Sequence, residues 1–317
     1  MANLKEVRTR IDSVKSTRQI TSAMKMVSAS KLRKAQNAIM ALRPYATKLQ
    51  EIMANVSDSI GSEDHAHLKK RKPKKVLLVV FTSNKGLCGA FNTNIIKKTI
   101  SYIRENFAEQ QKEGNVHLLS IGKKSTEYFK KYNYNMVANH DHIYDELSFA
   151  NVSAIAKKVM DEFAAEKYDV VELIYNKFVN AASQEVTTEQ FLPLEKAAED
   201  NQAEEYDYET DFEDDFGDDY EDNYEEYIFE PDKETITKEV IPKTLKIQFY
   251  KALLDSNASE HGARMTAMHQ ATENATKLVK ELQLSYNKAR QEAITNEILE
   301  VTTGAEALKV NLKTNLS

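Results

Sequence analysis

Heptad-spaced apolar residues at both ends of the chain constrain its fold more than any other feature. Residues 3–58 and roughly 240–303 both have the pattern of long helices. Helices at opposite termini can pair as an antiparallel coiled coil, which leaves the residues between them as a domain at one end. A helix of about 60 residues is about 90 Å long. We therefore expect a rod that protrudes from the rest of the chain.

The N-terminal stripe shifts register once and continues beyond Pro44, which should kink the helix without ending it. Its expected members are Leu4, Val7, Ile11, Val14, then Ile20, Met24, Val27, then Ala35, Ala38, Leu42, Tyr45, Leu49, Ile52 and Val56. The C-terminal stripe is expected to contain Ala275, Val279, Leu282, Tyr286, Ala289 and Ala293, continued by Ile294, Ile298 and Val301. Gly304 is expected to end that helix.

The middle of the chain alternates between strand and helix patterns. Strands are expected at residues 75–82, 116–121, 168–179 and 185–194, the last two forming a hairpin, and helices at 91–107, 124–132 and 149–165. Strand–helix alternation predicts an open, Rossmann-like, mostly parallel sheet with one antiparallel edge. The expected fold class is therefore α/β plus a long antiparallel helical coiled coil.

Composition suggests four segments. They are a coiled-coil helix at 1–60, an α/β domain at 74–194, an acidic insertion at 195–230 and a second coiled-coil helix at 231–317. Residues 195–227 contain 17 Asp and Glu against one Lys. Self-repulsion at this density predicts a flexible loop that is dispensable for folding. Docking of this loop on a basic face, as an electrostatic brake, is one role that we consider.

Composition also limits the class of protein. The single cysteine excludes an internal disulfide framework and suits a reducing compartment. No apolar run approaches the length of a membrane span, and the N-terminus lacks the apolar core of a signal peptide. Residues 1–36 contain nine Lys and Arg against two acidic residues, which would suit nucleic acid, a membrane surface or an acidic protein. Nucleic acid is disfavoured because aromatic stacking partners are lacking.

Two patterns could carry chemistry, and each has a simpler explanation. The loop at residues 83–92 follows a strand and opens a helix, where a phosphate could bind, but it has neither the Walker spacing nor the dinucleotide glycine triplet. Its glycines are explained by a tight turn, and Cys88 is interpreted as a structural thiol. The His65–His67 and His140–His142 pairs lack further clustered ligands, so no metal and no cofactor is expected.

Polar residues on the C-terminal helix are harder to explain as a solvated face. Small and amide side chains outnumber Lys–Glu pairs there, which favours a surface that slides past a partner. The residues concerned are Ser259, Glu260, His261, Arg264, Thr266, Gln270, Asn274, Asn287, Arg290, Gln291, Thr295 and Asn296.

Six runs of the sequence closely resemble the gamma subunit of F-type ATP synthases. They are Lys5–Arg8, Ile20–Leu32, Gly86–Asn92, Glu230–Asp232, Ala258–Met268 and Tyr286–Ile298. The resemblance covers nearly the whole chain in the same order. The acidic insertion departs from the family, being much longer than usual.

The resemblance implies a rotor subunit of the central stalk in a proton-translocating ATP synthase. Rotation of the membrane c ring would be coupled to conformational cycling of the catalytic beta subunits. The implied partners are the hexamer of three alpha and three beta subunits, the epsilon subunit and the c ring, and the chain itself would be non-catalytic. Membrane association would occur through the complex only, peripherally on the cytoplasmic face of the bacterial inner membrane.

The resemblance also assigns site residues. Met24 and Lys25 match the contact with the acidic lever segment of the beta subunit, and Arg290, Gln291 and Thr295 match a polar contact with a beta-subunit loop. The strip Tyr227, Ile228, Phe229 and Glu230 matches the contact with the c ring and epsilon. Without the resemblance, the pattern also fits a non-catalytic coiled-coil adaptor with an α/β head, or a Rossmann-type enzyme with helical extensions.

Overall fold

The computed structural model describes residues 4–57, 66–181, 183–194 and 233–314, and the side chains of all of these except 50–57, 233–238 and 306–314. The chain forms two compact units, Met1–Met26 with Ala267–Ser317, and Val27–Thr266. The acidic insertion and the strip Tyr227–Glu230 lie outside the described residues, as do His65 and the side chains of Ile52 and Val56.

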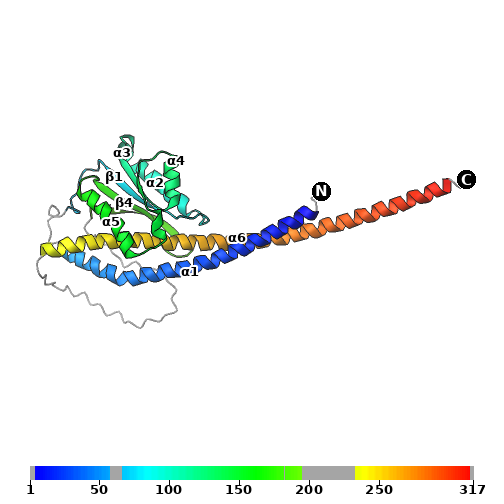
Figure 1. Ribbon diagram of the computed structural model, residues 1–317, viewed down its shortest axis with the longest axis horizontal. Coiled ribbons are helices and arrows are strands. Elements are labelled where there is room, and N and C mark those ends of the chain that lie inside the picture. Colours follow the sequence, from blue (N-terminus) through cyan, green and yellow to red (C-terminus); the bar gives the residue numbers. More distant parts are fainter. Residues whose placement is uncertain (1–3, 58–65, 182, 195–232, 315–317) are drawn as a thin grey trace, which may run out of the picture. The chain divides into compact units, whose positions relative to one another are not determined.

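Two long helices, α1 (Leu4–Ser57) and α6 (Lys233–Thr314), begin and end the described chain (Figure 1). In the first unit they pair antiparallel: the Thr272 hydroxyl donates to the Thr21 hydroxyl at 2.8 Å, and Lys25 Nζ lies 3.2 Å from His269 Nδ1. Apolar side chains from both helices are buried along this seam, among them Val7, Ile11, Met268, Ala275 and Val279. The predicted antiparallel coiled coil is confirmed.

The seam of α1 has one unbroken heptad register, so the predicted shift is wrong. Ile20 and Val27 are each 57% exposed, whereas Thr21 and Ser28 are buried. Tyr45 is exposed too, and the neighbouring Ala46 is half-buried in its place. The 3-4 spacing continues throughout the described side chains over positions 4, 7, 11, 14, 18, 21, 25, 28, 32, 35, 39, 42, 46 and 49. Hydrophobicity alone misplaced the seam because its middle is made of polar residues.

The C-terminal stripe is confirmed through Ala289, and it ends there. Every residue from Arg290 to Ala305 is exposed, including Ala293 and the apolar residues Ile294, Ile298 and Val301. The prediction that Gly304 ends the helix is wrong, because α6 continues to Thr314. Pro44 lies inside α1, which continues beyond it to Ser57.

The second unit contains the predicted α/β sheet. Its strands are β1 (Val76–Phe81), β2 (Val116–Ile121), β3 (Met136–Asn139), β4 (Val170–Phe178) and β5 (Gln184–Leu192), in the order β3-β2-β1-β4-β5. The first four are parallel, and β5 pairs antiparallel with β4. The sequence interpretation missed β3, a strand of four residues on the sheet edge.

Helices cover both faces of the sheet. The shorter ones are α2 (Phe91–Asn106), α3 (Ala108–Lys112), α4 (Lys123–Lys131), the 3-10 helix η1 (Asp141–Tyr144) and α5 (Phe149–Ala164). Residues of α2 and α4, such as Ile95 and Phe129, pack with Val76, Leu78 and Val80 on one face.

The other face is covered by α5 together with α6. The Phe249 ring of α6 meets the rings of Phe81 and Phe191 at centroid distances of 5.4 and 5.6 Å, and Ile241, Leu245 and Leu253 belong to the same core. Each such side chain stabilises the fold by about 1.5–3 kcal/mol through burial. The helix α6 therefore forms a layer of the α/β domain and is also one of the two helices of the coiled coil.

Candidate functional site

Open α/β sheets bind ligands at the carboxyl ends of their strands. In this protein the corresponding place is the carboxyl edge of β1 and β4. From β1 the chain leads to β2 on one side, and β4 lies on the other side of β1, which makes this edge a topological switch point. The loop after β1, predicted as a possible phosphate site, lies here. Residues 255–266 of α6 occupy the same edge.

Hydrogen bonds and a close approach fix α6 at this edge. The Ser259 hydroxyl donates to the carbonyl of Asn176 in β4, and the Thr266 hydroxyl donates to the carbonyl of Ala181, both at 3.0 Å. A Cβ added to Gly262 would lie 3.3 Å from the Ala181 oxygen, so only glycine fits there without a shift. The small side chains of α6 thus let the helix lie directly against the strand ends.

Arg264 joins α6 to the loop after β1. Its Nη2 donates to the carbonyl of Lys85 at 3.0 Å, and its Nε lies 3.4 Å from the carbonyl oxygen of Gly86. Its Nη1 lies 2.7 Å from Glu260 Oε1, and both side chains are only 9% exposed. A buried guanidinium with a carboxylate and two carbonyl partners is well compensated for the loss of water.

Burial sets the protonation of the groups beside Arg264. Burial raises the pKa of Glu260, and the charges of Arg264, Lys31 and Lys85 oppose this rise. Burial, together with the charge of Arg264, lowers the pKa of His261 to about 4. His261 is therefore neutral near pH 7, and its Nδ1 can accept a hydrogen bond from Arg264 Nη1 at 3.3 Å.

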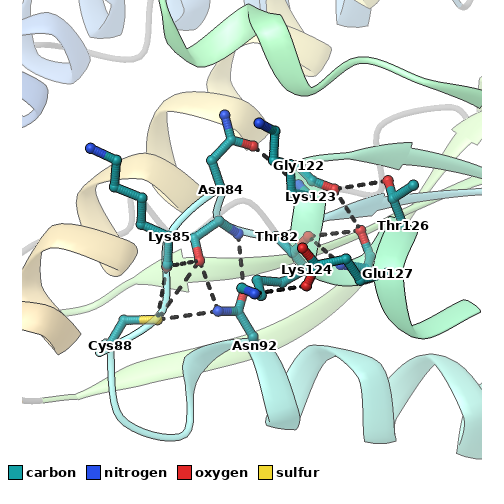
Figure 2. A network of polar contacts seen from close by, with 12 residues as sticks. Thr82, Asn84, Lys85, Cys88, Asn92, Gly122, Lys123, Lys124, Thr126 and Glu127 are labelled. Atoms are coloured by element: carbon teal, nitrogen blue, oxygen red, sulfur yellow. Dashed lines mark hydrogen bonds and ion pairs between the residues drawn. The ribbon is translucent and has the colours of Figure 1, made fainter.

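The loop after β1 is held by its own side chains. The Asn92 amide donates to the Ser83 hydroxyl at 2.7 Å and to Cys88 Sγ at 3.2 Å, as Figure 2 shows for Asn92 and Cys88. Asn84 accepts from the Lys123 backbone amide and donates to the carbonyl of Asp141. Cys88 is buried, and burial raises the pKa of its thiol, as expected for a structural thiol.

The loop turns the carbonyl oxygens of Lys85 and Gly86 toward α6. Phosphate binding needs converging N–H groups, whereas Lys85 and Gly86 present acceptors that Arg264 satisfies. Leu87 has a φ of 62°, the left-handed region that is costly for a branched residue, and it is 65% exposed. The glycine-rich motif therefore shapes an acceptor for Arg264.

This arrangement corrects the interpretation of the polar helix face. Ser259, Glu260 and Arg264 are buried against the protein's own domain, so they cannot form a surface that slides past a partner. The residues from Gln270 onward in that set remain exposed. The i, i+4 spacing of Glu260 and Arg264 was visible in the sequence, but their partners in the loop were not.

The described histidines of the two pairs, His67, His140 and His142, belong to no metal-binding cluster. His67 is buried beside the Phe163 ring, and His142 pairs with Asp145 at 3.6 Å on the surface. Over the described side chains, no group of three or more His, Cys, Asp or Glu residues could hold a metal ion. Within the same part of the chain, no helix is both long enough and apolar enough to cross a bilayer.

The residues predicted to contact the beta subunit lie in two separate parts of the first unit. Met24 and Lys25 are half-buried on α1, with Lys25 next to His269. Arg290, Gln291 and Thr295 lie on the exposed part of α6, where the Thr295 hydroxyl donates to the Gln291 carbonyl at 2.9 Å. The structure does not bring the two sets together.

Comparison with known proteins agrees with the fold. The protein-family model described as ATP synthase matches residues 3–308. The ATP synthase gamma chain of Flavobacterium psychrophilum is 52% identical over 310 residues, which cover 98% of this chain and all of that one. The gamma chain of Christiangramia forsetii is 53% identical over 313 residues, covering 97% of this chain and 99% of the relative.

Two solved structures are similar as well. A chain from Tetrahymena thermophila mitochondrial ATP synthase, in a structure of its central stalk and c ring, has a TM-score of 0.53 and 26% identity, covering 80% of this chain and 99% of its own. A chain of Euglena gracilis mitochondrial ATP synthase in rotational state 3 has a TM-score of 0.63 at 22% identity, covering 96% and 94%.

An α/β sheet crossed by one of two paired terminal helices, together with the family match, defines an ATP synthase subunit. More narrowly, the chain belongs to the family of ATP synthase gamma chains.

We predict that Arg264→Ala destabilises the second unit by about 3–5 kcal/mol, because it leaves Glu260 buried without its cation. The loss should be smaller at pH 5 than at pH 8. The raised pKa of Glu260 rises further without Arg264, so the carboxyl is neutral in the folded state at low pH and costs stability as the pH rises. Urea unfolding at the two pH values measures this.

The matched control is Arg264→Ala in a Glu260→Gln background, where no carboxylate remains to be left unpaired. There the loss should be smaller and much less dependent on pH. Equal losses at both pH values in the single variant would contradict the assignment.

Proposed function

We propose that this chain is the rotor of the central stalk in an F-type ATP synthase and couples rotation of a membrane c ring to conformational cycling of catalytic beta subunits. The observation that carries this is the exposed part of α6, residues 290–305, in a chain of the gamma family. Ile294, Ile298, Leu299 and Val301 are all about half exposed or more. Apolar side chains gathered on one exposed helix are typical of a surface that a partner encloses.

The proposed partners are the hexamer of three alpha and three beta subunits, the epsilon subunit and the c ring. The proposed location is peripheral, on the cytoplasmic face of a bacterial inner membrane, since both gamma-chain relatives are bacterial proteins. The chain itself is proposed to be non-catalytic. This is supported by α6, which occupies the sheet edge where an α/β enzyme would bind its substrate.

The mechanism follows from asymmetry. A single shaft cannot contact three identical beta subunits in the same way, so each is biased toward a different conformation. A difference in contact energy of about 1.4 kcal/mol changes the population ratio of two states tenfold. Turning the shaft moves these biases from one subunit to the next, and by reciprocity ATP hydrolysis turns the shaft.

Two groups of contacts are proposed from the resemblance. Met24 and Lys25 would meet the acidic lever segment of beta, where the positive charge of Lys25 is favourable. Arg290, Gln291 and Thr295 would meet a polar beta-subunit loop. The exposure of the second group supports its availability, and the half-buried Lys25 retains part of its side chain at the surface.

The isolated chain should hydrolyse no ATP, and it should stimulate hydrolysis when it is added to purified alpha and beta subunits. Phosphate release with and without those subunits measures this. Hydrolysis by the pure chain alone would favour a Rossmann-type enzyme. Folding without any stimulation or co-assembly would favour the coiled-coil adaptor.

Arg290→Ala with Gln291→Ala should lower ATP-driven proton pumping and ATP synthesis while the complex still assembles. Each lost hydrogen bond to a partner costs about 1–3 kcal/mol in the rotor orientations that form it. The matched control is Lys277→Ala with Lys280→Ala, two exposed residues on the part of α6 that pairs with α1. Wild-type pumping and synthesis at wild-type expression would remove Arg290 and Gln291 from the proposed contact.

Cysteines introduced at positions 227–230 should crosslink to the polar loops of c subunits or to epsilon. A cysteine at Lys131, exposed at the end of α4, serves as the control, and the buried Cys88 should stay unreacted. Mass spectrometry of the assembled complex identifies the products. Crosslinks to alpha subunits alone would refute the placement of the strip Tyr227–Glu230.

A further inference from the structure

A short basic segment, residues 69–75, precedes β1. Six of its seven residues are Lys or Arg, the exception being Pro73. Its backbone is fixed to the domain: the amides of Lys74 and Lys75 both donate to Asp169 Oδ2, at 3.0 and 2.9 Å. Gln110 Nε2 donates to the Pro73 carbonyl at 2.8 Å. The backbone of this segment is therefore held in place on the surface of the domain.

In the basic segment, the Arg71 side chain packs against the domain, whereas lysine side chains face solvent. Arg71 lies over the Phe163 ring at 5.0 Å, donates to the Phe163 carbonyl and pairs with Glu166. Lys69, Lys72, Lys74 and Lys75 are exposed, and among the described residues none of the four has an ion-pair partner. A row of exposed lysines whose side chains form no ion pair with the described residues creates a positive field that attracts an anionic partner.

The chain's most acidic part starts beside this surface. The amide of Leu194 donates to the carbonyl of His67 at 3.0 Å, which places the end of the β5 segment two residues from Lys69. The next residue, Glu195, opens the stretch to Tyr227 with its 17 acidic residues and one lysine. The same stretch is tethered at its far end, because α6 begins at Lys233.

The acidic stretch can reach the basic segment easily. A chain extends by up to about 3.3–3.6 Å per residue, so ten residues beyond Leu194 already span about 33–36 Å, more than the seven residues of the basic segment. Tethering makes the encounter intramolecular, with an effective concentration in the millimolar range. An outside partner would have to compete at that concentration.

We propose that the basic segment is the docking surface for the chain's own acidic insertion, with residues 204–226 as its occupant. Charge complementarity and the hydrogen bond between Leu194 and His67 support this choice over the basic residues of α1. The contact would mask the lysines from other polyanions, such as anionic lipid headgroups, while salt is low. Because the surface is held by Asp169 and Gln110, docking requires no rearrangement of the domain.

Lysine footprinting of the full-length chain tests the proposal. Acetylation rates are measured by mass spectrometry in wild type and in a variant whose Asp and Glu at 204–226 are replaced by Asn and Gln. Lys69, Lys72, Lys74 and Lys75 should react severalfold faster in the variant. Lys97, Lys98 and Lys123, which are exposed on α2 and α4, should react equally in both and serve as internal controls.

Salt and concentration complete the test. In 1 M salt, where the screening length is about 3 Å, the difference between the two proteins should disappear. Equal rates at low salt, or protection that survives neutralisation of the insertion, would overturn the proposal. Protection that grows with protein concentration would also overturn it, by showing that the occupant is a second chain.

Discussion

The structure of the second unit depends on α6, which packs against the sheet on one side and against α1 on another. Between Ile241 and Thr266, α6 packs Phe249 and Leu253 into the core of the sheet, while Ala258 and Met265 contact Leu32 and Ala35 of α1. A helix with neighbours on most sides cannot keep a polar exterior. The charged residues Glu260 and Arg264 of this stretch are buried and paired with each other.

The sequence was sufficient for the parts of the fold that local rules determine. Buried apolar runs predicted β1, β2 and β4, and turn residues predicted the hairpin to β5, because these strands are long and strongly patterned. The four-residue β3 was missed, since a strand that short is stabilised by its pairing with β2 more than by its own composition. Gly304 was wrongly read as a stop, because an exposed helix tolerates a glycine at a cost of about 1 kcal/mol.

Less of the candidate site than of the fold could be predicted from the sequence. The glycine loop and the Ser259–Arg264 run were both noticed, but Arg264 lies 178 and 179 residues from its loop partners Gly86 and Lys85, and no local rule joins them. The loop was therefore interpreted as a tight turn, with a phosphate site as the alternative, and the helix as an outer surface, when each is the partner of the other. Arg264 is what decides between these interpretations, because a buried cation must find acceptors nearby.

The composition of the seam in α1 has a mechanical consequence. Around Thr21 and Lys25 the helices are held by hydroxyl and amine contacts, whereas Val7 and Ile11 on one side and Leu32 and Ala35 on the other bury apolar surface. Thr21 is buried, so a shift along this stretch would leave its hydroxyl without a partner inside the seam, which costs more than sliding one apolar side chain past another. The hydrogen bond between Thr272 and Thr21 therefore fixes the axial register of the two helices within the first unit, as a buried polar residue does in other coiled coils.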